Sequence, residues 1–177
     1  MTNVFDTFVH RTTPEAVHPD RDQGSTDYVA AGVMTAPTYL KWALLYEEPD
    51  SQTVWLAKAC PRDWLQPLVD PISVQDATTR YGRVSYQLDA ELHPQTGVYT
   101  VLANVTLDSQ IVNSPPPGGI RLRLRAPVGH AGKLKAVSVG GQNWVAFDAK
   151  LETINFAAKA LNPKLLAGMN AIVATFE

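Results

Sequence analysis

The chain has 177 residues, a length that suits one domain with a single core, and a composition of 45% hydrophobic and 18% charged residues excludes a disordered chain. Its formal net charge of −2 excludes a strongly basic nucleic-acid-binding module. No run approaches the ~18 consecutive apolar residues that a membrane-spanning helix needs, so we expect a soluble domain with neither nucleic acid nor a membrane as partner.

Cysteine content and the first residues say little about the cellular compartment. Cys60 is the single cysteine, so no disulfide forms within the chain, but many periplasmic proteins also lack disulfides. The N-terminus lacks the basic segment and apolar core that are typical of a signal peptide. The location of the protein is therefore left open.

The first 36 residues are polar and interrupted. Prolines and glycines recur too often for a sustained helix or strand, so residues 1–36 are predicted to form an extended N-terminal arm or linker. Within this arm, the alternation of VFDTFVH predicts one short strand over residues 4–10. The folded domain is predicted to span residues 37–177.

A first β-hairpin is predicted over residues 39–59. The alternation of YLKWALLY (39–46) favours a strand, the charged stretch EEPDSQ favours a turn, and the β-branched and aromatic run of residues 53–59 favours a second strand. Pro61 then suits the first position of a helical turn. We expect Trp64 in that turn to fold back and be buried on the sheet.

A second hairpin is predicted from the regular alternation of residues 83–92 and 98–107 around a turn. The dipeptide Gly140-Gly141 suits the positive φ of a tight hairpin turn. Further strands are expected at residues 120–124, 134–139, 142–147, 153–156 and 171–176, with an irregular Pro-Pro-Pro-Gly-Gly segment before the first of them and a loop or short helix over residues 157–169. Eight to ten short strands at this spacing indicate an all-β fold, an antiparallel β-sandwich of jelly-roll or supersandwich type.

The histidines form no recognisable metal motif. None has a second histidine two or four residues away, and a metal site needs three or four converging ligands. We interpret them as loop residues in solvent and expect no metal and no cofactor; they are His10, His18, His93 and His130. The absence of a Gly-x-Ser-x-Gly elbow, a phosphate-binding glycine loop and a His-Glu-x-x-His helix excludes the commonest motif-bearing enzyme classes.

The carboxylates form no recognisable catalytic pair either. Glu47 and Glu48 are expected as solvated charges on a hairpin turn, and Asp148 is expected to start an Asx-turn or to cap a loop. Glycoside hydrolysis needs two carboxyl groups roughly 5 to 10 Å apart in a cleft. We therefore assign no catalytic residue.

Three arginines alternate with leucines and so line one face of a strand: Arg121, Arg123 and Arg125. One interpretation is a ladder that binds uronate or sulfate groups bidentately. The interpretation that we favour is a solvated outer face or an edge protected by charge.

Among the tryptophans, Trp144 follows two polar residues and is predicted to offer a surface platform for a sugar ring. The other three, Trp42, Trp55 and Trp64, are expected in the core. Arg80 is expected to form a structural ion pair. The candidate carbohydrate-binding residues are therefore Trp144, Tyr81, Arg121, Arg123 and Arg125.

Four segments together resemble a known family: ACPRDWL (59–65), DATTRYGRVSY (76–86), IRLRLRAP (120–127) and VSVGGQNWVAFDAKLETINF (137–156). They are similar to the C-terminal β-domain of bacterial six-hairpin glycosidase-like proteins, in which an α/α toroid precedes a β-sandwich. Thr78 stands where the family usually has proline, and Gln142 stands where it usually has lysine. Both departures concern turn geometry.

The resemblance implies a non-catalytic accessory domain. Its partner would be an α/α toroid that holds the catalytic acids, or another protein chain, and any export signal would lie upstream in the parent protein. A free-standing carbohydrate-binding module that holds a polysaccharide through Trp144, Tyr81 and the arginine strand is the alternative. A third alternative is a carbohydrate lyase or isomerase on a sandwich fold.

Overall fold

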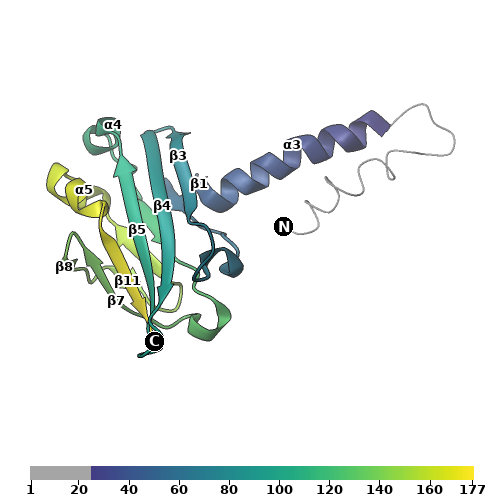
Figure 1. The fold of residues 1–177 in the computed structure, drawn as a ribbon. Helices are drawn as coiled ribbons and strands as arrows, with labels where there is room; N and C mark the ends of the chain where they lie inside the picture. The colour runs from purple at the N-terminus through teal and green to yellow at the C-terminus, as the bar shows by residue number, and fades with distance from the viewer. Residues whose placement is uncertain (1–24) are drawn as a thin grey trace. The chain divides into compact units, whose positions relative to one another are not determined.

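The computed structural model describes residues 25–177 (Figure 1). The chain separates into a first unit that ends at Ala43 and a compact unit that runs from Leu44 to Glu177. Of the first unit, the structure describes helix α3 (Ser25–Leu44). The strand predicted over residues 4–10 lies outside the described residues.

The compact unit is built on two β-sheets. One has five strands in the order β1-β2-β6-β10-β9, and the other has six in the order β3-β4-β5-β11-β7-β8. All neighbouring strands pair antiparallel except β2 and β6, which run parallel. The strands are β1 (Leu45–Glu48), β2 (Thr53–Leu56), β3 (Ile72–Thr79), β4 (Gly82–Leu92), β5 (Tyr99–Leu107), β6 (Ile120–Arg123), β7 (Leu134–Val139), β8 (Gln142–Asn143), β9 (Phe147–Asp148), β10 (Thr153–Phe156) and β11 (Ile172–Phe176).

The core lies between the two sheets. In the five-stranded sheet, Leu122 pairs with Leu56 on one side and with Ile154 on the other, and all three side chains are fully buried. They belong to one apolar cluster with residues of the other sheet, such as Tyr86 and Phe176. Full burial of each such side chain is worth about 1.5 to 3 kcal/mol, so this layer is the main source of stability. The prediction of an all-β sandwich is confirmed.

The strand predicted over residues 39–46 is wrong for most of its length, because helix α3 continues to Leu44. Tyr39 and Trp42 lie one helical turn apart, and their rings meet edge to face with centroids 5.6 Å apart. A short apolar run of this kind satisfies both the period of a strand and the three-residue spacing of a helix. The predicted extended arm is also wrong over residues 25–36, which are helical despite the glycine and the following proline.

The hairpin predicted from residues 83–92 and 98–107 is confirmed as β4 and β5. One alternating set of side chains is buried on each strand, namely Val84, Tyr86, Leu88, Ala90, Tyr99, Val101, Ala103, Val105 and Leu107. Strand β3, which pairs with β4, was not predicted. Its register shifts between Val74 and Ala77, and Asp76 has a φ of 47°, so its alternation is interrupted by a bulge.

Glycines make two turns possible. Gly140 and Gly141 have φ angles of 57° and 75°, which confirms the predicted tight turn between β7 and β8. A Cβ on Gly118 would lie 2.2 Å from the carbonyl oxygen of Ser51, and one on Gly119 would lie 2.3 Å from that of Phe156. The Gly118-Gly119 segment can therefore pass closely between the ends of β2 and β10 only because it has no side chains.

Short helical elements connect the strands: η2 (Arg62–Leu65), α4 (Ser109–Asn113), η3 (Val128–His130), η4 (Ala158–Ala160) and α5 (Pro163–Met169). The helical turn predicted after Pro61 is confirmed as η2, with Pro61 at its cap position. Leu65 is its fully buried residue, whereas Trp64, which we expected to be buried, is half-buried against the core. Among the described residues, no helix has both the length and the apolar character of a membrane span.

Candidate functional site

An open groove with a volume of about 510 Å³ lies along the five-stranded sheet. Its lining includes polar and aromatic side chains from four strands and their connections, among them Trp55, Arg121, Trp144, Asp148, Thr153 and Asn155. Arg121 and Trp144, two of the candidate carbohydrate-binding residues, therefore share one cavity.

Three cross-strand neighbours form one row of the groove. Trp55 of β2 pairs with Arg121 of β6, and Arg121 pairs with Asn155 of β10. Along each strand these residues alternate with side chains of the core, such as Leu122 and Ile154. The row therefore lies on the face of the sheet that is turned away from the core.

Trp55 is held in place by its polar neighbours. Its indole nitrogen donates a hydrogen bond to Oε2 of Glu48 at 3.3 Å. The ammonium of Lys58 lies 4.9 Å from the ring centroid, and the guanidinium carbon of Arg121 lies 5.0 Å from it. Both are cation–π distances, so the Trp55 ring orients Arg121. Trp55 is buried as expected, with 9% exposed, but it lies on the face turned away from the apolar cluster between the sheets.

The polar groups of Arg121 and Asn155 are unmatched within the described part of the chain. The guanidinium of Arg121 contacts the Trp55 ring and forms no hydrogen bond or ion pair with a described residue. Asn155 uses its backbone, which donates to Ala146 O at 2.8 Å and accepts from Nε1 of Trp144 at 3.3 Å. Its side-chain amide bonds to no described residue. The groove thus offers planar donors and an amide to a ligand.

Trp144 forms one wall of the groove. Its ring packs on Phe156 with centroids 5.3 Å apart, and the residue is half-buried. The prediction of a surface platform is therefore correct only for the part of the ring that Phe156 leaves uncovered. Asp148, on the same groove, accepts a hydrogen bond from the backbone N–H of Leu151 at 2.8 Å. This bond reaches three residues along the chain rather than the two of an Asx-turn, so Asp148 caps the loop before β10.

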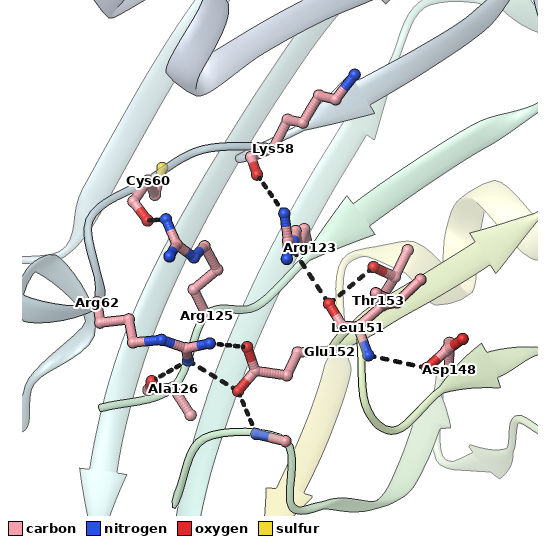
Figure 2. A network of polar contacts seen from close by, with 11 residues as sticks. Lys58, Cys60, Arg62, Arg123, Arg125, Ala126, Asp148, Leu151, Glu152 and Thr153 are labelled. Atoms are coloured by element: carbon pink, nitrogen blue, oxygen red, sulfur yellow. Dashed lines mark hydrogen bonds and ion pairs between the residues drawn. The ribbon is translucent and has the colours of Figure 1, made fainter. Parts of the chain in front are cut away.

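A second polar cluster, the Arg62–Glu152 network, lies close to the same strands (Figure 2). The carboxylate of Glu152 is fully buried and pairs with Arg62 through two contacts of 2.9 Å, one to each oxygen. Its Oε1 also accepts the backbone N–H of Gly132 at 2.9 Å, and Arg62 donates to the carbonyl oxygen of Ala126. A buried charge is tolerated only when it is paired in this way, so the network is structural.

Arg123 and Arg125 extend this network rather than the groove. Arg123 donates to the carbonyl oxygens of Leu151 at 3.1 Å and Lys58 at 3.2 Å, and Arg125 donates to that of Cys60 at 3.2 Å (Figure 2). Burial, and then the neighbouring Arg125, lowers the pKa of Arg123. For Arg123 and Arg125 the favoured interpretation of a solvated face or a charged edge is corrected, because β6 lies inside the sheet and these two guanidinium groups tie it to neighbouring segments.

The remaining candidates lie elsewhere. Tyr81 is at the turn between β3 and β4 of the six-stranded sheet and packs against the core. Nε of Arg80 lies 3.3 Å from Oε1 of Glu47, which confirms the ion pair expected for Arg80, and Glu47 is partly exposed.

Glu48 is partly exposed and is also held by protein donors. It accepts from the hydroxyl of Ser51 at 2.7 Å, from Trp55, and from the ammonium of Lys58 at 3.2 Å. These hydrogen bonds, that from Ser51 first, lower the pKa of Glu48 to about 2. A group with such a pKa stays ionised and is a poor general acid.

The histidines show no metal site within the described residues. His93 is exposed as predicted, but His130 is half-buried and stacks on Tyr99 with centroids 5.0 Å apart, so the solvent interpretation is wrong for it. His10 and His18 lie outside the described residues. Within residues 25–177, no three side chains of the His, Cys, Asp and Glu types are close enough to hold a metal ion.

Comparisons with family models, with curated proteins and with solved structures found no match to the chain.

Trp55 and Asn155 are groove residues that sequence reasoning missed. Every residue of β2 is buried, so no alternation marks Trp55 as turned away from the core. Asn155 lies between the buried Ile154 and Phe156, and this alternation of polar and apolar residues could have placed its side chain on the face opposite to the core.

Proposed function

We propose that the chain is a non-catalytic accessory β-sandwich domain of a glycoside-hydrolase-like protein. The observation that carries this proposal is the Arg62–Glu152 network. Arg62 comes from ACPRDWL, Glu152 from the segment that ends in LETINF, and Ala126 from IRLRLRAP, so three of the four segments that resemble the family meet in one buried cluster. The residues of these segments are used for a buried ion pair and for contacts with the backbone. This use supports a domain in which the family-like segments stabilise the fold and perform no catalysis.

The state of the carboxylates also supports a non-catalytic role. Five carboxylates are committed to contacts within the fold: Glu47 to Arg80, Glu48 to Lys58, Asp108 as the cap of α4, Asp148 as a loop cap, and Glu152 to Arg62. A glycosidase needs one carboxyl group whose pKa is raised so that it can act as an acid. Glu48 has a lowered pKa instead.

Exposed apolar residues offer contact area to a partner domain. Leu68 is fully exposed with a φ of 68°, and Val69 and Val128 are also exposed. Leu68 and Val69 follow η2, and Val128 is the first residue of η3. The hydrogen bond from Arg62 of η2 to the carbonyl oxygen of Ala126, just before η3, links the two segments. In the proposed arrangement these residues contact the α/α toroid of the parent protein.

An activity screen tests this proposal. The purified chain is expected to release no sugar from a panel of aryl glycosides and polysaccharides, and Glu47→Gln, Glu48→Gln and Asp148→Asn variants are expected to match it. Turnover that is lost in one of these variants, while unfolding remains cooperative, would overturn the accessory role in favour of an enzyme.

A free-standing carbohydrate-binding module is the second candidate, and the groove favours it. Aromatic walls with a few convergent polar groups are typical of ligand sites. Light scattering separates the two candidates, because a domain that has lost its toroid should self-associate through exposed apolar residues. The control is a Leu68→Ser variant, which should self-associate less. A clean monomer that binds polysaccharide, and loses that binding in Trp144→Ala, would favour the module.

A further inference from the structure

The groove contains a positive charge that no described residue neutralises. Arg121 is half-buried, forms no ion pair with a described residue, and its guanidinium carbon is 5.0 Å from the ring of Trp55. A guanidinium on an aromatic ring keeps its in-plane N–H groups available, and their fork geometry matches a carboxylate. The orientation therefore suits an anionic, planar group of a ligand.

The residues around Arg121 can bind the hydroxyl groups and the ring of a sugar whose anionic group lies on Arg121. The side-chain amide of Asn155, directly across the strand pair from Arg121, bonds to no described residue and can both donate to and accept from ring hydroxyls. Trp144 bonds to the backbone of the same Asn155, which places its indole at that end of the row. Asp148, with one oxygen on the Leu151 N–H, adds a further acceptor for hydroxyls.

We propose that this groove binds an acidic oligosaccharide, with the carboxylate of a uronic acid residue on Arg121, hydroxyls on Asn155, and a sugar ring against Trp144. The volume of about 510 Å³ is within the range of pockets that hold small ligands. This inference rests on the carbohydrate-binding candidate and not on the accessory role.

The test is titration calorimetry of the full chain with tetrasaccharides of galacturonate, glucuronate and mannuronate. Each is paired with the same tetrasaccharide after reduction of its carboxyl groups to alcohols. We expect at least one acidic form to bind at least tenfold more tightly than its reduced form, and to bind more weakly as salt is raised.

Variants assign the binding to Arg121. Arg121→Gln is expected to weaken the acidic ligand at least tenfold, while Arg121→Lys, which keeps the charge but not the fork, gives a smaller loss. Arg83→Gln, which removes an exposed arginine of the six-stranded sheet, is the matched control and should leave affinity unchanged. Thermal unfolding of each variant shows whether the fold is retained.

The outcomes separate the hypotheses. Equal affinity for acidic and reduced forms overturns the uronate inference and leaves the carbohydrate-binding candidate standing. No binding to any sugar overturns both the uronate inference and the carbohydrate-binding candidate, and it leaves the proposed accessory role unaffected. An effect of Arg83→Gln as large as that of Arg121→Gln overturns the assignment to the groove.

Discussion

Two regions of the five-stranded sheet use neighbouring arginines in opposite ways. In the Arg62–Glu152 network, the guanidinium groups of Arg62, Arg123 and Arg125 donate to a buried carboxylate or to backbone carbonyls. In the groove, Arg121 lies against Trp55 and donates to no described residue. Arg121 and Arg123 belong to the same strand and point to the same face, so their roles are set by what the other segments place beside them.

The comparison indicates that the bonded arginines contribute to stability, whereas Arg121 is available to bind a ligand. A buried ion pair is costly to break from one side, because the remaining charge loses its partner in a region without water. A half-exposed arginine on an aromatic ring can be changed with little effect on folding.

Arg62→Leu should lower the free energy of unfolding by about 3 to 5 kcal/mol, because it leaves the fully buried carboxylate of Glu152 without its cation. Urea unfolding followed by tryptophan fluorescence measures this. The double variant Arg62→Leu, Glu152→Leu is the control and should recover part of the loss. Equal stability of Arg62→Leu and the wild type would show that Glu152 is solvated, contrary to the structure.

Arg123→Met should cost about 1 to 3 kcal/mol, because the carbonyl oxygens of Lys58 and Leu151 each lose a charged donor. Methionine keeps an unbranched stem of similar length, so the measurement isolates the polar contacts. The same urea experiment applies. A loss below about 0.5 kcal/mol, which is typical of surface changes, would mean that water replaces the arginine without penalty.

Glu48→Gln should change the acid stability of the region beside Trp55. The folded-state pKa of Glu48 is lowered to about 2, against 4.5 for the free side chain, so its contribution is fully present above pH 4.5 and is lost as the pH falls through about 2. Unfolding free energies from pH 6 to pH 2 should therefore fall less steeply in the variant. Parallel curves for the two proteins would contradict the hydrogen bonding seen at Glu48.

Arg121→Met should have the smallest effect, within about 0.5 kcal/mol of the wild type, because Arg121 forms no hydrogen bond with a described residue and only rests on a ring. It is the matched partner of Arg123→Met on the same strand. Should both variants lose the same stability, the distinction between a structural and a ligand-binding arginine on β6 would fail.

Part of the fold and of the site could be predicted from the sequence. Regular alternation over β4 and β5 predicted both strands and their buried faces, and a glycine pair predicted the turn between β7 and β8. Trp144 and Arg121 were named as candidates, and the structure places both on one groove. The association of Trp55 and Asn155 with them could not be predicted, because it depends on the parallel pairing of β2 with β6 and on the pairing of β10 with β6.

By itself the sequence determined the class of the fold, because the side-chain period of a strand and the turn chemistry of glycine and proline are local properties. The sequence left open the secondary structure of the run before Leu44, because the periods of a strand and of a helix both fit it, and the structure shows a helix. Tertiary structure also decided which arginine is bonded and which is available. Hydrogen-bond partners such as Glu152, Leu151 and Lys58 come from distant segments, and only folding brings them to a guanidinium.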